Sequence, residues 1–239
     1  MSMGRNINRE TTFRFKEFSV SNNRSAMKIG TDSVLLGAWA DVTGTQSALD
    51  VGCGTGILSL MLAQRGVNHI TGIEIDPTAA EEASENAERS PWKGTIEIKC
   101  GDCTTMECDR KFDLIISNPP YFNSELRSPE ATRATARHEA SLNFASLMRL
   151  SSTSLTPSGR LAFIAPADRA DDIMWEATLQ RLHLLRRCDV VTSQRRGASR
   201  TLWEFSAAPC VPSTSSLILR NPDGTPTKEY QKLTEAFYL

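Results

Sequence analysis

A short segment with two prolines carries residue types that could activate an amino group. Asn118, Pro119, Pro120 and Tyr121 follow an apolar run at 112–117. An Asn side-chain oxygen and the next backbone carbonyl can each accept one N–H, which holds a planar NH2 group and shifts charge onto its nitrogen. The prolines keep the chain extended, so these carbonyls are not consumed by a helix, and Tyr121 can stack on the planar group. The segment predicts a site that makes a planar nitrogen nucleophilic, although the same four residues are also typical of a simple turn.

A glycine-rich turn precedes this segment. Gly52, Gly54 and Gly56, with Cys53 between the first two, follow an apolar stretch that ends near Asp50. The glycines let a ligand lie against bare backbone at the start of a helix. Their spacing differs from the dinucleotide fingerprint. We expect Asp50 to hold a cation or a bridging water near the amino group of a methionine moiety.

Carboxylates end the next two apolar runs. Glu74 lies 24 residues after Asp50, beside Ile75, and is placed to accept both hydroxyls of a ribose. Asp102 can accept from an adenine NH2, with the backbone N–H of Cys103 alongside. The carboxyl ends of parallel strands meet at one edge of a sheet, where open α/β sheets bind ligands. The order of these residues predicts a site for S-adenosylmethionine and an enzyme that methylates a planar nitrogen.

The elements that must position these residues alternate along the chain. Such alternation predicts a mostly parallel sheet with helices on both faces. We expect seven sheet strands, at 47–51, 69–75, 95–100, 112–117, 160–165, 184–192 and 200–207. The expected helices lie at 55–65, 78–89, 141–155 and 168–182, with a strand at 13–20 and a helix at 31–40 before them and a short amphipathic helix at 227–239.

Length and composition fit one α/β domain. The chain has 239 residues, 40% apolar and 23% charged, which is typical of soluble globular proteins. Residues 1–46 are expected to form an extension that covers the cofactor site within a single domain, 1–239. The amino terminus lacks a secretory pattern and no segment reads as a membrane span, so we expect a cytoplasmic protein whose six cysteines are thiols. Cys100, Cys103 and Cys108 lack a second pair or a His cluster, so we expect no metal site.

The net charge of −1 argues against a surface that binds nucleic acid everywhere. Local basic clusters could still meet phosphates, although each could equally be a solvated charged face. The candidate RNA-binding residues are Arg127, Arg133 and Arg137 in one cluster and Arg195, Arg196 and Arg200 in another.

Longer blocks carry a resemblance to a known family. The chain resembles the class I, Rossmann-like methyltransferases that modify adenine N6 in valine tRNA beside the anticodon, at position 37. The resemblance runs from about Phe13 to the last residue. The blocks that carry it are Phe13–Phe18, Met27–Trp39, Ser117–Tyr121 and Leu233–Leu239.

The resemblance implies further roles. Lys28, Gly30, Thr31 and Asp32 would cover the methionine end of S-adenosylmethionine, and a tRNA anticodon loop would be the partner. A simpler role for Thr31 or Asp32 is to cap the helix that starts there. The basic run near 195–201 departs from the family pattern because glycine, alanine and serine interrupt it.

The expected reaction is an in-line displacement in which adenine N6 attacks the sulfonium methyl group. The nitrogen becomes acidic as it gains the methyl, so its proton can leave to water late, and neither a metal nor a strong base is needed. The target base should turn out of its stack, which is easiest in a loop.

Other functions share the same residues. A glutamine-N5 methyltransferase of a release factor would use the same planar NH2 chemistry, but such enzymes usually carry a helical domain before the first strand. A DNA adenine or ribosomal guanine methyltransferase is chemically equivalent. A non-enzymatic alternative is an RNA-binding module with a relic cofactor pocket, which would bind cofactor without turnover. The sequence leaves the oligomeric state open.

Overall fold

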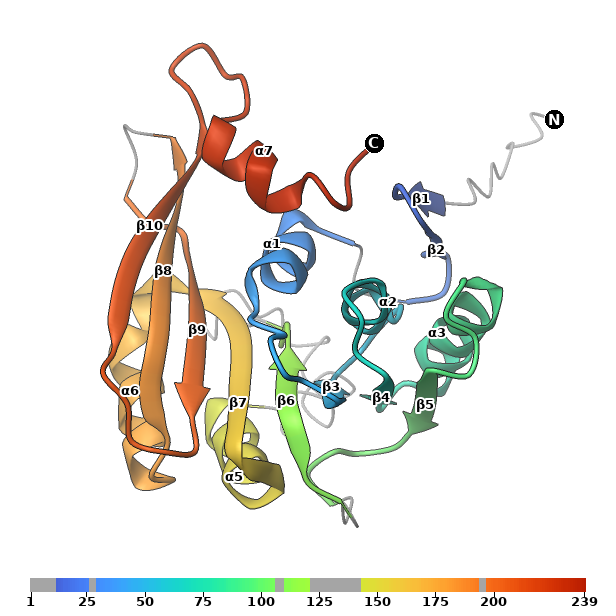
Figure 1. Ribbon diagram of the computed structural model, residues 1–239, viewed down its shortest axis with the longest axis horizontal. Coiled ribbons are helices and arrows are strands. Elements are labelled where there is room, and N and C mark those ends of the chain that lie inside the picture. The colour runs from blue at the N-terminus through green and yellow to red at the C-terminus, as the bar shows by residue number, and fades with distance from the viewer. Residues whose placement is uncertain (1–11, 26–28, 106–109, 121–142, 194–196) are drawn as a thin grey trace, which may run out of the picture.

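The fold centres on an eight-stranded sheet with the strand order β10-β8-β9-β7-β6-β3-β4-β5. The computed structural model describes residues 12–25, 29–105, 110–120, 143–193 and 197–239. All neighbouring strands pair in parallel except β9, which is antiparallel to both β7 and β8 (Figure 1). The sheet strands are β3 Ser47–Val51, β4 His69–Glu74, β5 Ile96–Cys100, β6 Phe112–Ser117, β7 Leu155–Pro166, β8 His183–Ser193, β9 Arg200–Ser206 and β10 Ser213–Arg220.

Helices cover both faces of the sheet. On one face lie α1 Thr31–Trp39, α2 Ile57–Gln64, α3 Pro77–Arg89 and α7 Lys228–Thr234, and on the other lie α5 Phe144–Ser154 and α6 Ala170–Leu179, preceded by the 3-10 turn η1 Ala167–Arg169 (Figure 1). Alternate residues of each strand therefore enter different cores. In β6, Leu114 and Ile116 pack with α1 and α2, whereas Ile115 packs with α5 and α6. Both faces are buried, so the central strands are mostly apolar.

The sequence expectation of seven sheet strands was wrong by one strand. The eighth, β10, pairs only with β8 and forms an edge of the sheet. Its first four residues, Ser-Thr-Ser-Ser, are exposed, so the strand carries little of the apolar pattern that marks a buried one.

The expected strand at 13–20 is also wrong as a single element. It forms two short antiparallel strands, β1 Thr12–Arg14 and β2 Ser19–Ser21, joined by a turn in which the Phe15 N–H donates to the Phe18 carbonyl. Both rings are buried and stack on each other at a centroid separation of 4.7 Å. The turn lets both phenylalanines enter one core, which a continuous strand would not.

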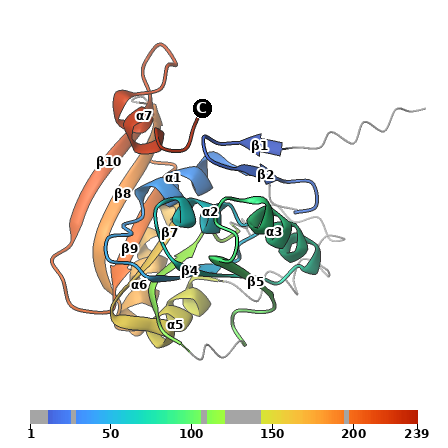
Figure 2. The ribbon, with the colours of Figure 1, turned by 45° about the vertical axis from the view of Figure 1, so that its right-hand side comes forward.

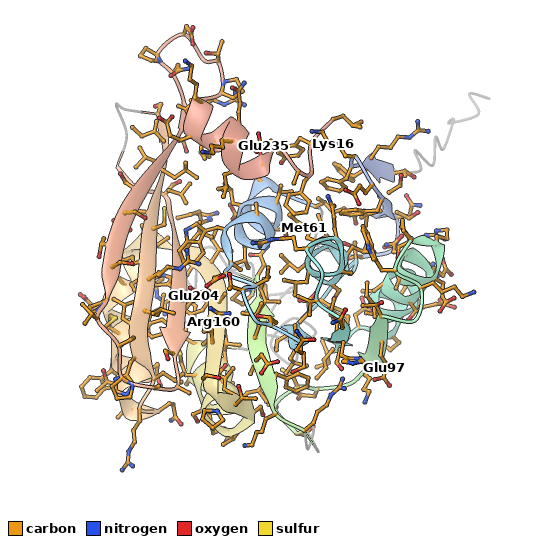
Figure 3. All side chains as sticks on the ribbon, in the orientation of Figure 1. Lys16, Met61, Glu97, Arg160, Glu204 and Glu235 are labelled. Atoms are coloured by element: carbon orange, nitrogen blue, oxygen red, sulfur yellow. The ribbon has the colours of Figure 1, made fainter. Side chains whose placement is uncertain are left out.

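The hairpin formed by β1 and β2 lies beside the carboxyl terminus of the chain (Figure 2). The Lys16 N–H donates to the Phe237 carbonyl, and the Lys16 ammonium donates to the Glu235 carbonyl (Figure 3). Phe237 is buried against α1, α2 and the hairpin, in the same cluster as Met61 of α2. The two ends of the described chain therefore share one core with α2, the helix that follows the glycine-rich turn. Within the described ranges, no helix is long and apolar enough to cross a membrane.

A buried carboxylate attaches the segment after the hairpin to α3. Glu82 is 1% exposed, and its two oxygens accept from the backbone N–H groups of Asn23, Arg24 and Ser25 at 2.7 to 3.2 Å. Asn86, one turn further along α3, accepts from the Ser21 N–H and donates to the Thr55 carbonyl. These bonds place residues 21–25 against the glycine-rich turn.

We expect Glu82→Gln to destabilise the fold by about 3 kcal/mol, because buried N–H groups would face a neutral amide in place of a charge. Urea unfolding of the two proteins measures the difference. Glu81→Gln is the matched control, since the Glu81 side chain is 67% exposed and solvent screens its ion pair with Arg24, so its loss should change stability little. Equal losses in the two variants would contradict a structural role for the buried carboxylate.

Candidate active site

Strand pairing brings the proline-containing segment beside the glycine-rich turn. In the parallel pair β3 and β6, Asp50 lies opposite Ile116, so Asn118 emerges next to Gly52. The buried Ser117 hydroxyl donates to the Val51 carbonyl at 2.8 Å and fixes the two strand ends. A pocket opens at this edge of the sheet. It is lined by Ile29, Ser33, Gly52, Cys53, Gly54, Thr55, Ile57, Leu58 and Asn118.

The glycine-rich turn requires its glycines. Gly52, Gly54 and Gly56 have φ angles of 68°, 54° and 78°, in the left-handed region that other residues rarely adopt. Gly56 is also the N-cap of α2, and a side chain there would meet Ala83 of α3 at 3.4 Å. The bare backbone of the turn forms one wall of the pocket, as expected for a loop that carries a ligand.

Cys53 faces away from solvent. Its side chain is 5% exposed, and a Cβ added at Gly72 of β4 would come within 3.0 Å of its sulfur. Burial raises the pKa of this thiol well above its ordinary value, with further contributions from Asp50 and Glu74. Only a small surface of Cys53 is therefore available to a ligand.

Asp50 is fully buried behind the turn. Its Oδ2 accepts from the backbone N–H of Ser59 at 3.0 Å and from the Ser59 hydroxyl at 2.7 Å, which attaches the end of β3 to α2. Among the described residues, none donates a hydrogen bond to its Oδ1. Burial raises the pKa of Asp50 to about 7, Glu74 adds to the rise, and the bonds from Ser59 oppose it. Asp50 thus supports the turn from behind, and its role toward a methionine amino group stays a prediction.

The two later carboxylates lie at the same edge. Glu74 ends β4, where its Oε2 accepts from the Gly54 N–H at 2.8 Å and its Oε1 accepts from the Asp76 N–H at 3.0 Å. Each oxygen keeps a second lone pair for a hydroxyl donor. Asp102 follows β5, and its Oδ1 accepts from the N–H and hydroxyl of Thr104 at 2.8 and 2.7 Å. Next to it, Cys103 is buried.

The first turn of α1 closes the pocket on the side of Asn118. Asn118 donates its Nδ2 to the Ser33 hydroxyl at 2.9 Å, and Asp32 forms an ion pair of 2.8 Å with Arg200 at the start of β9. Sequence reasoning missed Ser33. Its position in the Met27–Trp39 block was the only available signal.

The expected cap at Thr31 or Asp32 is wrong. Gly30 occupies the N-cap position, and a glycine has no side chain with which to cap the helix. The Asp32 carboxylate instead binds Arg200, a residue assigned from sequence to RNA. The ion pair draws the Asp32 carboxylate toward β9, so it does not cap its own helix.

Some predicted residues lie outside the described ranges. They are Lys28, Tyr121, Arg127, Arg133, Arg137, Arg195 and Arg196. The residues that the structure does bring to one edge of the sheet are the glycine-rich turn, Glu74, Asp102 and Asn118, with Asp50 directly behind. Among the described residues, no three His, Cys, Asp or Glu side chains gather as metal ligands would.

We expect the stability difference between Asp50→Asn and the wild type to depend on pH. An acid whose pKa is about 7 when folded and near 4 when unfolded costs stability as pH rises through that window, because only the unfolded chain is then ionised. An asparagine avoids this cost and can still accept from Ser59. Urea unfolding at pH 5 and pH 8 should show the variant gaining roughly 2 to 3 kcal/mol relative to the wild type at the higher pH. A difference independent of pH would contradict the buried, protonated carboxyl.

The fold and the site together define a class I methyltransferase. Such enzymes have a parallel sheet with an antiparallel strand near one end, and their methyl donor is S-adenosylmethionine. A predicted O-methyltransferase from Agrobacterium tumefaciens has the same fold, with a TM-score of 0.67 at 19% identity over 86% of this chain and 96% of that one. A second structure, described as that of a putative class I S-adenosylmethionine-dependent methyltransferase from Listeria monocytogenes, gives a TM-score of 0.56 at 16% identity over 77% of this chain and 62% of that one.

Sequence comparison narrows the class to a family. The family described as methyltransferase small domain matches residues 23–187. A tRNA1(Val) (adenine(37)-N6)-methyltransferase of Bacteroides fragilis is 40% identical over 95% of this chain and 97% of its own length. One from Porphyromonas gingivalis is 42% identical over 95% of this chain and 94% of its own. This chain belongs to the tRNA1(Val) (adenine(37)-N6)-methyltransferase family, and it is a methyltransferase that uses S-adenosylmethionine.

Proposed function

We propose that this chain transfers a methyl group to N6 of the adenine at position 37, beside the anticodon of a valine tRNA. Relatives at 40% and 42% identity over nearly their whole length carry that activity in their names. The observation that carries the proposal is the placement of Asn118. It lines the pocket formed by the glycine-rich turn, and its side-chain NH2 group is already bound by Ser33.

Features of the pocket and of the adjoining sheet edge support binding of the cofactor that the family uses. Glycines with positive φ leave its wall without side chains, and Glu74 stands beside Gly54 at the sheet edge. When bound, S-adenosylmethionine supplies the methyl group as a sulfonium electrophile. Glu74 would accept from ribose hydroxyls, and Asp102 with Cys103 would bind the adenine ring.

Asn118 would orient the nucleophile. The amide Oδ1 and the Pro119 carbonyl would accept the two N–H bonds of adenine N6, which aims its lone pair away from the ring plane. These bonds strengthen as positive charge develops on nitrogen, so they favour the transition state over the ground state. Ile29, Ile57 and Leu58 give the pocket apolar walls, which strengthen such contacts by limiting water. The proton then leaves the methylated nitrogen for water.

The test uses tRNA from a strain lacking this gene. The purified protein is incubated with that tRNA and labelled cofactor, and the nucleosides are analysed. We expect label in N6-methyladenosine of valine tRNA, and none in a valine tRNA transcript with guanosine at position 37. Label in a release-factor glutamine or in ribosomal guanine would favour the alternative acceptors. Cofactor binding without transfer to any of them would favour a non-catalytic RNA-binding module.

Contacts to RNA remain part of the proposal. Arg127, Arg133 and Arg137 follow the proline-containing segment in sequence, and we propose that they meet phosphates next to the flipped base. Arg200 already forms an ion pair with Asp32, so it is a weaker candidate for a phosphate contact. A tRNA substrate supports the proposal that the protein acts in the cytoplasm.

A further inference from the structure

We propose that Ser33 is a positioning residue for methyl transfer, which acts by orienting the amide of Asn118. The inference rests on the proposed function, because it assigns Ser33 a part in activating the acceptor nitrogen. Ser33 lies in the first turn of α1, is 7% exposed and lines the same pocket as Asn118. Its hydroxyl accepts from Nδ2 of Asn118 at 2.9 Å.

In the structure this hydrogen bond holds the donor end of the Asn118 amide on Ser33. An asparagine amide has nearly the same shape in its two flipped orientations, but one end only accepts and the other only donates. With Nδ2 on Ser33, Oδ1 is on the opposite side and can accept from an incoming N–H. In the flipped orientation the NH2 group would face the NH2 of the acceptor, and two donors would oppose each other.

The first turn of α1 is itself fixed in place. Asp32 pairs with Arg200 of β9, with the two side chains 28% and 35% exposed. Further along the helix, a Cβ at Gly37 would come within 2.6 Å of the Met61 sulfur, so α1 lies close against α2. Ser33 therefore holds the amide from a backbone that is attached on two sides, which limits how far Asn118 can turn.

The decisive experiment is a double-mutant cycle between Ser33→Ala and Asn118→Ala, measured as single-turnover methylation of tRNA with labelled cofactor. We expect Ser33→Ala to lower the rate about tenfold in the wild-type background, as the loss of one orienting bond would. In the Asn118→Ala background it should have no further effect, because the amide it orients is gone. Ser33→Thr keeps the hydroxyl and should retain at least half the wild-type rate.

Two measurements distinguish a loss of Asn118 orientation from a general disturbance of the fold. Calorimetry should show cofactor affinity within about threefold of the wild type for Ser33→Ala, since Ser33 acts on the acceptor side. The side-chain amide protons of Asn118, assigned by nuclear magnetic resonance through their loss in Asn118→Ala, should exchange with solvent faster in Ser33→Ala. Ser151→Ala is the matched control: it removes a buried serine hydroxyl of α5 that donates to the Leu147 carbonyl, and it should change none of these readouts.

Independent, multiplying effects in the cycle would overturn the inference, as would a Ser33→Thr variant no faster than Ser33→Ala. A loss confined to cofactor affinity would overturn it too, because Ser33 would then act on the cofactor. Failure of the wild-type protein to methylate any tRNA is a separate result. It would remove the proposed function and, with it, the role assigned to Ser33.

Discussion

Asn118→Ala should lower the methylation rate about a hundredfold or more while cofactor affinity changes by no more than a few-fold. Its Oδ1 would accept from the acceptor nitrogen, and that bond strengthens as charge develops in the transition state. The cofactor would retain the glycine-rich turn, Glu74 and Asp102. Single-turnover rates with saturating tRNA and calorimetry with S-adenosylmethionine give the two quantities.

Asn68→Ala is the control for this variant. The Asn68 amide is exposed and donates to the Gln46 side chain at 3.0 Å, at the opposite end of β4 from Glu74. Its removal should leave both rate and affinity unchanged. An Asn118→Ala protein that retained near-normal turnover would remove Asn118 from the catalytic mechanism, and a protein that lost cofactor binding to the same extent as rate would make it a binding residue instead.

Glu74→Ala should weaken S-adenosylmethionine binding by roughly 10- to 100-fold, because hydrogen bonds to a charged acceptor contribute about 1.5 to 3 kcal/mol. Two effects add. The carboxylate would lose its bonds to ribose hydroxyls, and the Gly54 N–H would lose the acceptor that it now has at 2.8 Å. Calorimetry of cofactor binding measures the sum.

Glu74→Gln separates the two effects in part, since its amide oxygen can still accept from Gly54 but carries no charge. Glu97→Ala is the matched control, because Glu97 lies on the neighbouring strand β5 with its side chain 61% exposed, where it pairs with Lys99 (Figure 3). Unchanged affinity in Glu74→Ala would remove this residue from the cofactor site. An equal loss of cofactor affinity in Glu97→Ala would indicate that the change in net charge, and not a contact of Glu74 with the cofactor, weakens binding.

Local pattern was enough to place the ends of the central strands. The runs at 47–51, 69–74 and 112–117 are mostly apolar and short, and each is followed by a turn signal, so their positions could be predicted within one residue or so. Parallel pairing then forces those ends to one edge. The glycines of the turn were informative because positive φ is a property of the residue type, independent of what packs around it.

Weak local pattern explains the errors in the fold. The edge strand β10 begins with four exposed serines and threonines. Backbone hydrogen bonds pair it with β8, and such bonds leave no pattern in the side-chain sequence. The segment 13–20 alternates as a strand would, but its turn at 15–18 places Phe15 and Phe18 in the core with Phe237, more than 200 residues away.

The sequence by itself determined the order of chemical groups at the sheet edge: the glycine-rich turn, the carboxylates of Glu74 and Asp102, and the amide of Asn118. Tertiary structure alone decided what supports them. Ser33 meets Asn118, Asp32 meets Arg200, and Glu82 binds the N–H groups of residues 23–25. These partners are separated by 57 to 168 residues in the chain, so no local spacing encodes them. They arise because packing α1, α3 and β9 around one sheet brings buried polar groups within reach, and a buried polar group without a partner is costly.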